Sequence, residues 1–301
     1  SQATGKVSIK MQVIFQTGAH STEHERLLKC LLGNRDLFAE RGVVVPGPGR
    51  YRPLLNQAFD AMDDAEPADD AREVLVDAIL DAETADRVVL LNTHFFGNQR
   101  SALGENAFYP MAEQRVSQMR QLFEFDQVEL FMAIRNPASF VPAVLTDAVP
   151  ARIRRVMDKI EPTQLRWSEL FERIRAAAPD VPITVWCNED APLIWSQIIR
   201  EVGGLEHNSK VVGGFSLLSD IMTRDGMARF RAYLQQHKDM SEMHRRRIIA
   251  AFLDKYAKPD EVEEEIDLPG WTEDLIDDLT EIYDEDVFAI QRIPGVQFIT
   301  P

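Results

Sequence analysis

The sequence contains little cysteine and no pattern that would hold a metal ion. Only two of the 301 residues are cysteines, Cys30 and Cys187, and each lies in an apolar run. This usage predicts buried free thiols and favours a reducing compartment. No spacing of Cys and His matches a zinc site, so we expect no metal. With no signal peptide visible, the sequence predicts a cytoplasmic protein.

Long apolar runs are also missing, and positive charge is scarce. No run approaches the roughly 20 residues that span a bilayer, so no membrane span is predicted. The 33 basic residues are outnumbered by 49 acidic ones, which gives a net charge of −16. Such a surface repels nucleic acid and anionic lipid, and neither is expected as a partner. A local basic pocket for one small anion is still compatible with this charge.

What the sequence does contain is a hydrophobic content of 45%, arranged as short apolar runs between helical patterns. Runs such as 87–91 and 128–134 are rich in Val, Ile and Leu, which is typical of parallel strands buried on both faces. The alternation predicts an α/β protein with a doubly wound, mostly parallel sheet and helices on both faces. The predicted strands are 7–15, 43–45, 87–91, 128–134, 181–187 and 296–299.

Helical patterns fill the segments between these strands and dominate after about residue 215. We therefore predict a nucleotide-binding α/β domain at 1–215 and a helical C-terminal lobe, packed on it, at 216–301. The PGPG segment at 46–49 is predicted as a loop, and the basic run at 244–247 as a solvated surface neutralised by the acidic residues 263–265. The longer predicted helices are 23–41, 71–83, 140–160, 164–178, 217–256 and 269–291.

The segment of greatest functional interest is QTGAHSTEHE at 16–25, which joins the first strand to the first helix. Unpaired N–H groups at such a helix start bind anions in many α/β proteins. One interpretation is an anion site formed by backbone N–H groups and the hydroxyls of Ser21 and Thr22. The alternative is a plain capping box, in which Thr22 caps the helix and Glu25 reaches back to it.

The charged residues of this segment bear on both interpretations. The carboxylates of Glu23 and Glu25 stabilise a helix start but repel a bound anion. Protonated His20 and His24 would offset that repulsion, since both titrate near neutrality. A transfer reaction that uses the histidines and Glu23 with a metal is a third, less favoured hypothesis, because this loop spacing lacks the geometry of known metal sites.

Polar residues follow three other predicted strands, where functional loops of parallel sheets lie. Arg135 is suited to pair with a phosphate or, alternatively, with an acidic helix. Ser139 supplies a hydroxyl to the same anion or caps a helix. His94 is a candidate general base, or a structural histidine. Glu189 and Asp190 are interpreted as caps of the next helix.

Three segments together resemble a known family. They are VIFQTGAHSTEHERLL with the following NRDLFAERGVVVP, then FMAIRNPASF, and finally VWCNEDAP. They are similar to the 5′-phosphosulfate loop with its downstream segment, to the R-D-P segment, and to a later acidic strand end of bacterial sulfotransferases. The fold of that family is related to the P-loop kinases. The resemblance spans about residues 10–200.

This resemblance implies transfer of a sulfuryl group from 3′-phosphoadenylyl sulfate (PAPS) to a hydroxyl or amine of a small-molecule or glycan acceptor. It implies that His20 and His94 are catalytic, His94 as the base, and that Arg135 and Ser139 bind the 3′-phosphate. The residues implied to bind the 5′ end of the donor are Thr17, Gly18, Ser21, Thr22 and His24.

The chain departs from the family pattern at several of these positions. Ser21 replaces the Lys that neutralises the leaving group, Glu23 replaces a loop Gly, and His24 replaces a hydroxyl residue. Asn136 replaces the Asp of R-D-P, and Ala143 stands where a Ser is expected. The loss of a Lys removes a charge that stabilises a developing anion. The alternative function is therefore a non-catalytic protein that keeps the fold to bind a protein partner.

Overall fold

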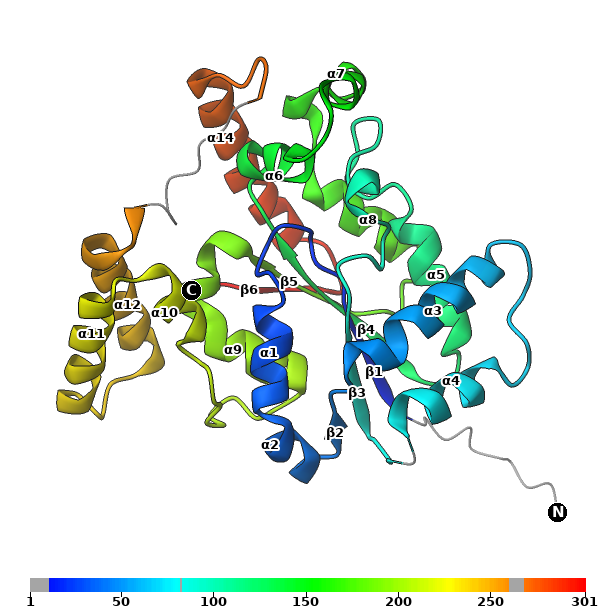
Figure 1. Cartoon of the computed structure of the whole chain (residues 1–301), viewed down its shortest axis with the longest axis horizontal. Coiled ribbons are helices and arrows are strands. Elements are labelled where there is room, and N and C mark those ends of the chain that lie inside the picture. Colours follow the sequence, from blue (N-terminus) through cyan, green and yellow to red (C-terminus); the bar gives the residue numbers. More distant parts are fainter. Residues whose placement is uncertain (1–10, 82, 260–267) are drawn as a thin grey trace.

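A computed structural model describes residues 11–81, 83–259 and 268–301 of the chain. It contains one six-stranded sheet in the order β2-β3-β1-β4-β5-β6, with every neighbouring pair parallel (Figure 1). The predicted doubly wound α/β fold is thereby confirmed. The strands are β1 (Gln12–Gln16), β2 (Val43–Val44), β3 (Arg87–Leu91), β4 (Gln127–Ile134), β5 (Ile183–Cys187) and β6 (Val296–Ile299).

Helices cover both faces of the sheet. Successive strand residues point to opposite sides, so a continuous apolar strand places apolar side chains on both faces. Val13 and Phe15 belong to one buried core, and Ile14 belongs to the other. The first core lies beneath α3 (Pro48–Met62), α4 (Ala71–Leu80), α5 (Ala112–Leu122), α6 (Pro137–Leu145), α8 (Trp167–Ala177) and α14 (Glu273–Gln291). The second lies beneath α1 (Arg26–Gly33), α2 (Arg35–Glu40) and α9 (Ala191–Gly203).

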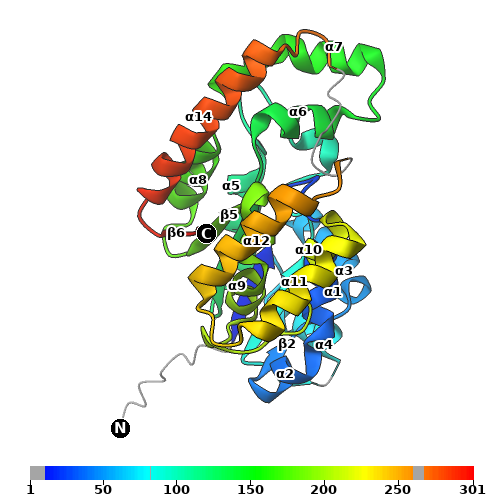
Figure 2. The same cartoon turned by 90° about the vertical axis from the view of Figure 1, so that its left-hand side faces the viewer.

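The C-terminal part of the chain separates into two groups. Helices α10 (Ser216–Ile221), α11 (Arg224–Gln236) and α12 (Glu242–Tyr256) surround a core of their own, next to α9. Figure 2 shows this group apart from α14, which lies along α8 and α6. β6 pairs with β5. Residues 268–301 therefore return to the sheet, whereas the predicted lobe comprised all of 216–301.

Several predicted helices are divided in the structure. The helix predicted at 140–160 is α6 followed by α7 (Pro150–Lys159), because Pro150 forces its predecessor out of helical geometry and starts a new helix. The helix predicted at 217–256 is α10, α11 and α12. The predicted PGPG loop is wrong in part, since α3 begins at Pro48. Residues 7–10 and the acidic run 263–265 lie outside the described residues.

The helix predicted at 23–41 is also divided, into α1 and α2, at Asn34. Helix α1 is attached to residues 212–220 by contacts spaced four residues apart along one face. They are Arg26 with Asp220 at 2.8 Å, Cys30 Sγ with Ser216 Oγ at 3.0 Å, and the Asn34 amide with both backbone groups of Val212 at 2.7 and 2.8 Å. No helix in the described ranges is both long and apolar enough to cross a membrane.

Candidate functional site

The carboxyl ends of β1 and β4 form the topological switch point of the sheet. The connection after β1 leads to β2 on one side, and the connection after β4 leads to β5 on the other, so the two loops diverge. Residues 17–25, here called the β1 loop, are attached to β4 by three backbone hydrogen bonds, the first from Thr17 N–H to Phe131 O at 3.0 Å. Ala133 N–H donates to Gly18 O at 2.6 Å, and Ala19 N–H donates to Ala133 O at 2.7 Å.

The predicted capping box is wrong. Helix α1 begins at Arg26, and Glu25 before it adopts the left-handed conformation with φ of 66°. The Glu25 carboxylate pairs with Arg52 at 3.0 Å instead of reaching back to Thr22. The Thr22 hydroxyl donates to Ala19 O at 2.9 Å. A capping box needs an extended residue at the N-cap position, and the residue directly before α1, Glu25, is left-handed instead.

Left-handed residues bend the β1 loop and leave its backbone donors unused. Ser21 has φ of 57° and His24 has φ of 49°. Within the described part of the chain, the N–H groups of residues 21–25 donate to no protein acceptor. Successive unpaired N–H groups of a turn with left-handed residues are the donors that bind anions. The anion-site interpretation thus keeps its backbone donors, although the cap geometry differs.

Gly18 permits this loop to form. Its φ is 109°, a conformation that L side chains rarely adopt, and a Cβ there would lie 3.2 Å from His20 N and 3.7 Å from the Thr93 side chain. Thr17 precedes it with no exposed surface, and its hydroxyl has no hydrogen-bond partner among the described residues. The local geometry therefore requires glycine at position 18.

A carboxylate of the chain itself lies at the start of α1. The Glu23 side chain is buried, and its Oε2 accepts a bond of 2.9 Å from Leu27 N–H, one of the first free donors of the helix. Burial raises the pKa of this carboxyl. Glu23 therefore occupies one of the donors that a bound phosphate or sulfate would use, which the sequence alone did not reveal.

His20 is a buried, neutral histidine. Burial, with a smaller contribution from His94, lowers its pKa to about 4. The Tyr109 hydroxyl accepts a bond of 2.9 Å from His20 N–H and lies 2.7 Å from Nδ1. Where the hydroxyl donates its one proton to Nδ1, the ring proton is on Nε2. Nε2 is buried and has no hydrogen-bond partner among the described residues.

His94 faces His20 from the loop after β3. The two ring centroids are 5.1 Å apart, and the His94 side chain is exposed. Its N–H donates to Asn92 Oδ1 at 2.9 Å, which fixes the backbone at the end of β3. The structure therefore brings together the two histidines that the sequence predicted as catalytic. His24 is exposed.

Arg135 lies at the end of β4 and joins two predicted site residues. Its Nη1 donates to Ser21 O at 2.6 Å, and its Nε donates to Ser139 Oγ at 2.9 Å. The side chain of Asn136 caps α6 by accepting a bond from Ala138 N–H at 3.0 Å, so the cap alternative for Ser139 is wrong. Arg135, Ser21 and Ser139 therefore form one cluster at the switch point.

The acidic residues after β5 do not cap α9. No side-chain cap bond is formed by Asp190, and the Glu189 carboxylate accepts a bond from Asn136 N–H at 2.9 Å. Glu189 therefore fastens the turn that carries Arg135. Across the described ranges, no group of three or more His, Cys, Asp or Glu side chains could hold a metal ion.

Tyr109 is the site residue that the sequence did not predict. It is fully buried, 89 positions after His20 in the chain, and no local pattern connects the two.

Comparison with known proteins identifies no relative, since no protein-family model and no curated protein matches this chain.

Proposed function

We propose that the chain is a sulfotransferase-like enzyme that binds PAPS at the β1–β4 switch point. The observation that carries the proposal is the position of the Arg135 guanidinium beside the unpaired N–H groups of residues 21–25. Backbone N–H groups and a planar guanidinium are the donors that bind phosphate and sulfate oxygens most specifically. The acceptor in this proposal is a hydroxyl or amine of a small molecule or glycan.

Two buried polar atoms without partners support the fit of such an anion. They are Thr17 Oγ1 and His20 Nε2. In the proposal Thr17, Gly18, Ser21, Thr22 and His24 surround the 5′ end of the donor, with Thr22 contributing N–H because its hydroxyl already donates to Ala19 O. Arg135 and Ser139 bind the 3′-phosphate. Arg135 is buried and has lost most of its hydration, and the negative phosphate compensates for part of that loss.

PAPS supplies an activated sulfuryl group, and the residues supply hydrogen bonds and a base. His20 Nε2–H donates to the bridging oxygen of the leaving phosphate, where the related family uses Lys. A neutral donor stabilises a developing anion less than a charged one. The sulfur–oxygen bond to phosphate breaks, a bond from sulfur to the acceptor oxygen or nitrogen forms, and His94 takes the acceptor proton.

The binding step is tested by calorimetric titration with adenosine 3′,5′-bisphosphate, the product of this reaction. We expect saturable binding that Arg135→Gln abolishes and Ser139→Ala weakens about tenfold. Ser139→Ala is informative because it leaves the bond from Arg135 to Ser21 O in place. Arg120→Gln is the control, since Arg120 pairs with Asp180 at the amino ends of the strands.

The catalytic step is tested by following sulfuryl transfer from PAPS to a panel of hydroxyl and amine acceptors. We expect His94→Gln to lower kcat by about 10²–10⁴-fold while adenosine 3′,5′-bisphosphate still binds. Transfer at an unchanged rate in that variant would remove His94 from the mechanism.

Glu23 favours a second candidate function, a non-catalytic interaction module. Its buried carboxylate already accepts Leu27 N–H, and Ser21 stands where the related family has Lys. The acidic surface suits a basic protein partner. This candidate predicts that neither adenosine 3′,5′-bisphosphate nor PAPS changes the thermal midpoint of the wild-type protein. Millimolar or tighter binding that depends on Arg135 would exclude it.

A further inference from the structure

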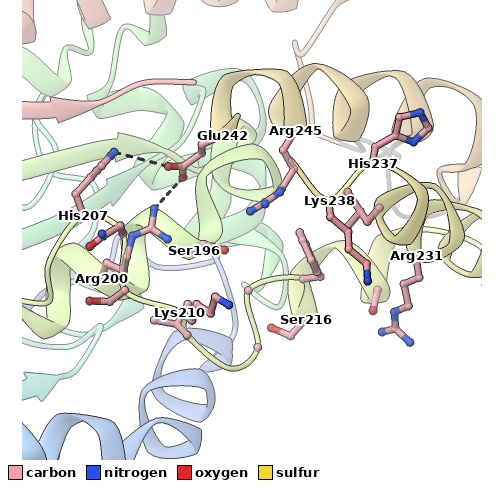
Figure 3. A pocket seen from close by; sticks show the side chains of 18 of the residues that line it. Ser196, Arg200, His207, Lys210, Ser216, Arg231, His237, Lys238, Glu242 and Arg245 are labelled. Atoms are coloured by element: carbon pink, nitrogen blue, oxygen red, sulfur yellow. Dashed lines mark hydrogen bonds and ion pairs between the residues drawn. The ribbon is translucent and has the colours of Figure 1, made fainter. Parts of the chain in front are cut away.

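A separate cavity lies beside α1, between α9 and the helices α10, α11 and α12 (Figure 3). Its volume is about 890 Å³, which is at the upper end of the range of small-molecule sites. The walls come from α9, from the loop of residues 207–214, and from the three C-terminal helices. It contains none of the residues of the β1–β4 site.

Positive side chains line this cavity although the chain as a whole is strongly acidic. Its two acidic residues are already paired with arginines, Asp220 with Arg26 at 2.8 Å and Glu242 with Arg200 at 2.8 Å. The remaining charges are therefore all positive. The Lys and Arg residues of the lining are Arg200, Lys210, Arg231, Lys238 and Arg245.

Four of these cations have no ion pair or side-chain hydrogen bond with any residue that the structure describes. They are Lys210, Arg231, Lys238 and Arg245. Arg245 Nε and Arg200 Nε are both inaccessible to solvent, and neither has an acceptor among the residues that the structure describes. Burial of a charged donor without an acceptor is unfavourable. The charge of an anion in the cavity would offset part of that cost.

Two of these cations approach the cavity from opposite walls. In Figure 3, Arg245 extends from α12 and Lys210 from the facing loop, and both side chains point into the space between them. Like charges that share a cavity repel one another, and the repulsion is relieved by a multivalent anion between them. Simple surface charges are more commonly directed away from each other into water.

Uncharged hydrogen-bonding groups complete the lining. The loop lies against α9 so closely that a Cβ at Gly214 would collide with the Ser196 hydroxyl, and Gly213 has φ of 82°. This wall is therefore held in place by packing. Hydroxyl and amide groups suit a ligand that has its own hydroxyls as well as charge. Those in the lining are Ser196, Asn208, Ser209, Ser216 and Ser219.

We propose that this cavity binds a small polyhydroxylated molecule with at least two phosphate or sulfate ester groups. Four unpaired cations match two such groups, because one phosphate ester carries a charge of about −1.5 to −2 at neutral pH. Phosphate and sulfate esters share the tetrahedral oxygens that these cations recognise. The inference is independent of the proposed function, since the two sites share no residue.

The test is calorimetric titration at 0.15 M NaCl with two probes in separate experiments. Inositol hexakisphosphate represents phosphate esters, and a trisulfated heparin disaccharide represents sulfate esters. We expect saturable binding of at least one probe, weakened about tenfold or more in Lys210→Gln/Arg245→Gln. Arg247→Gln is the matched control, because Arg247 is exposed on α12 and does not line the cavity. It should bind like wild type.

Each result decides the proposal. Binding of one probe alone identifies the ester, and binding of both supports the shared chemistry. No saturable binding of either probe below about 1 mM overturns it. Equal weakening by Arg247→Gln also overturns it, since the attraction would then be general. Circular dichroism of the double variant verifies its fold. Titration of that variant with adenosine 3′,5′-bisphosphate should be unchanged, which separates this cavity from the β1–β4 site.

Discussion

The β1–β4 site and the cavity beside α1 present positive potential by different means. The first uses backbone N–H groups and Arg135, together with a neutral His20 and a buried Glu23. The second uses formal side-chain charges with few partners. Backbone donors depend on the conformation of a loop, whereas charges depend on the identity of side chains. The two sites should therefore respond differently to pH, to backbone strain and to salt.

The largest expected difference concerns pH and His20. Its pKa is about 4 when folded and about 6.5 when unfolded, so the unfolded chain binds the additional proton between these values. Stability due to this group is therefore complete above about pH 6.5 and falls as the pH drops through about 4. The total loss is on the order of 3 kcal/mol.

Urea unfolding at pH 7 and pH 4.5 measures this effect. In His20→Gln the difference between the two pH values should shrink relative to wild type, whatever the absolute stability. The raised pKa of Glu23 acts in the opposite direction, but it is present in both proteins. His24→Gln is the control, because His24 is exposed. An unchanged pH dependence in His20→Gln would contradict the neutral, buried state of the ring.

Backbone strain at Gly18 is the next test, because the donors of the β1 loop depend on its conformation. Gly18→Ala places a Cβ at φ of 109° and close to His20 N, so we expect a loss of about 1–3 kcal/mol. Gly49→Ala in α3 meets no atom within 4 Å and should gain up to about 1 kcal/mol from helix propensity. Chemical denaturation at neutral pH measures both. Equal effects would show that the loop is not constrained at Gly18.

Glu23 tests how far the β1 loop depends on its own carboxylate. Glu23→Gln keeps an acceptor for Leu27 N–H but removes the negative charge, so affinity for adenosine 3′,5′-bisphosphate should rise roughly tenfold. Glu25→Gln is the matched control, because that exposed carboxylate is paired with Arg52 and should change affinity about threefold or less. No gain in the Glu23 variant would mean that the loop binds no anion near α1.

The smallest expected effect is a difference in salt dependence. Between 0.1 M and 1 M salt the Debye length falls from about 10 Å to about 3 Å, which screens exposed cations most. Binding of inositol hexakisphosphate to the cavity should therefore weaken more steeply than binding of adenosine 3′,5′-bisphosphate to the β1–β4 site. Titrations at both concentrations measure the two slopes. Parallel slopes would mean that the two sites attract anions by the same means.

The sequence predicted the architecture well because its strands are buried on both faces. Continuous apolar runs such as 87–91 have few alternatives in an α/β chain, and the structure has β3 at those residues. The helix ends were less predictable. The capping box at Thr22 failed because Ser21, His24 and Glu25 adopt left-handed conformations that tertiary contacts hold in place, as the Glu25–Arg52 pair does.

The sequence predicted part of the β1–β4 site but not the basic cavity, because only local patterns can be recognised in a sequence. Strand ends are recognisable in sequence, so Arg135, Ser139 and His94 could be predicted as candidate site residues. Tyr109 lies in a long loop, and only the fold brings it to His20. The basic cavity was not predicted, because its cations come from separate elements between residues 200 and 245. Each of them alone is typical of a solvated helix surface.

Helix α1 lies between the β1 loop and the segment 212–220, part of which lines the cavity. Its first turn follows the β1 loop, and its contacts at Arg26, Cys30 and Asn34 attach it to that segment. A coupling between two binding sites, where one exists, is reciprocal in binding free energy. If a ligand in the cavity changes the affinity of the β1–β4 site by some factor, the ligand of the β1–β4 site changes the affinity of the cavity by the same factor.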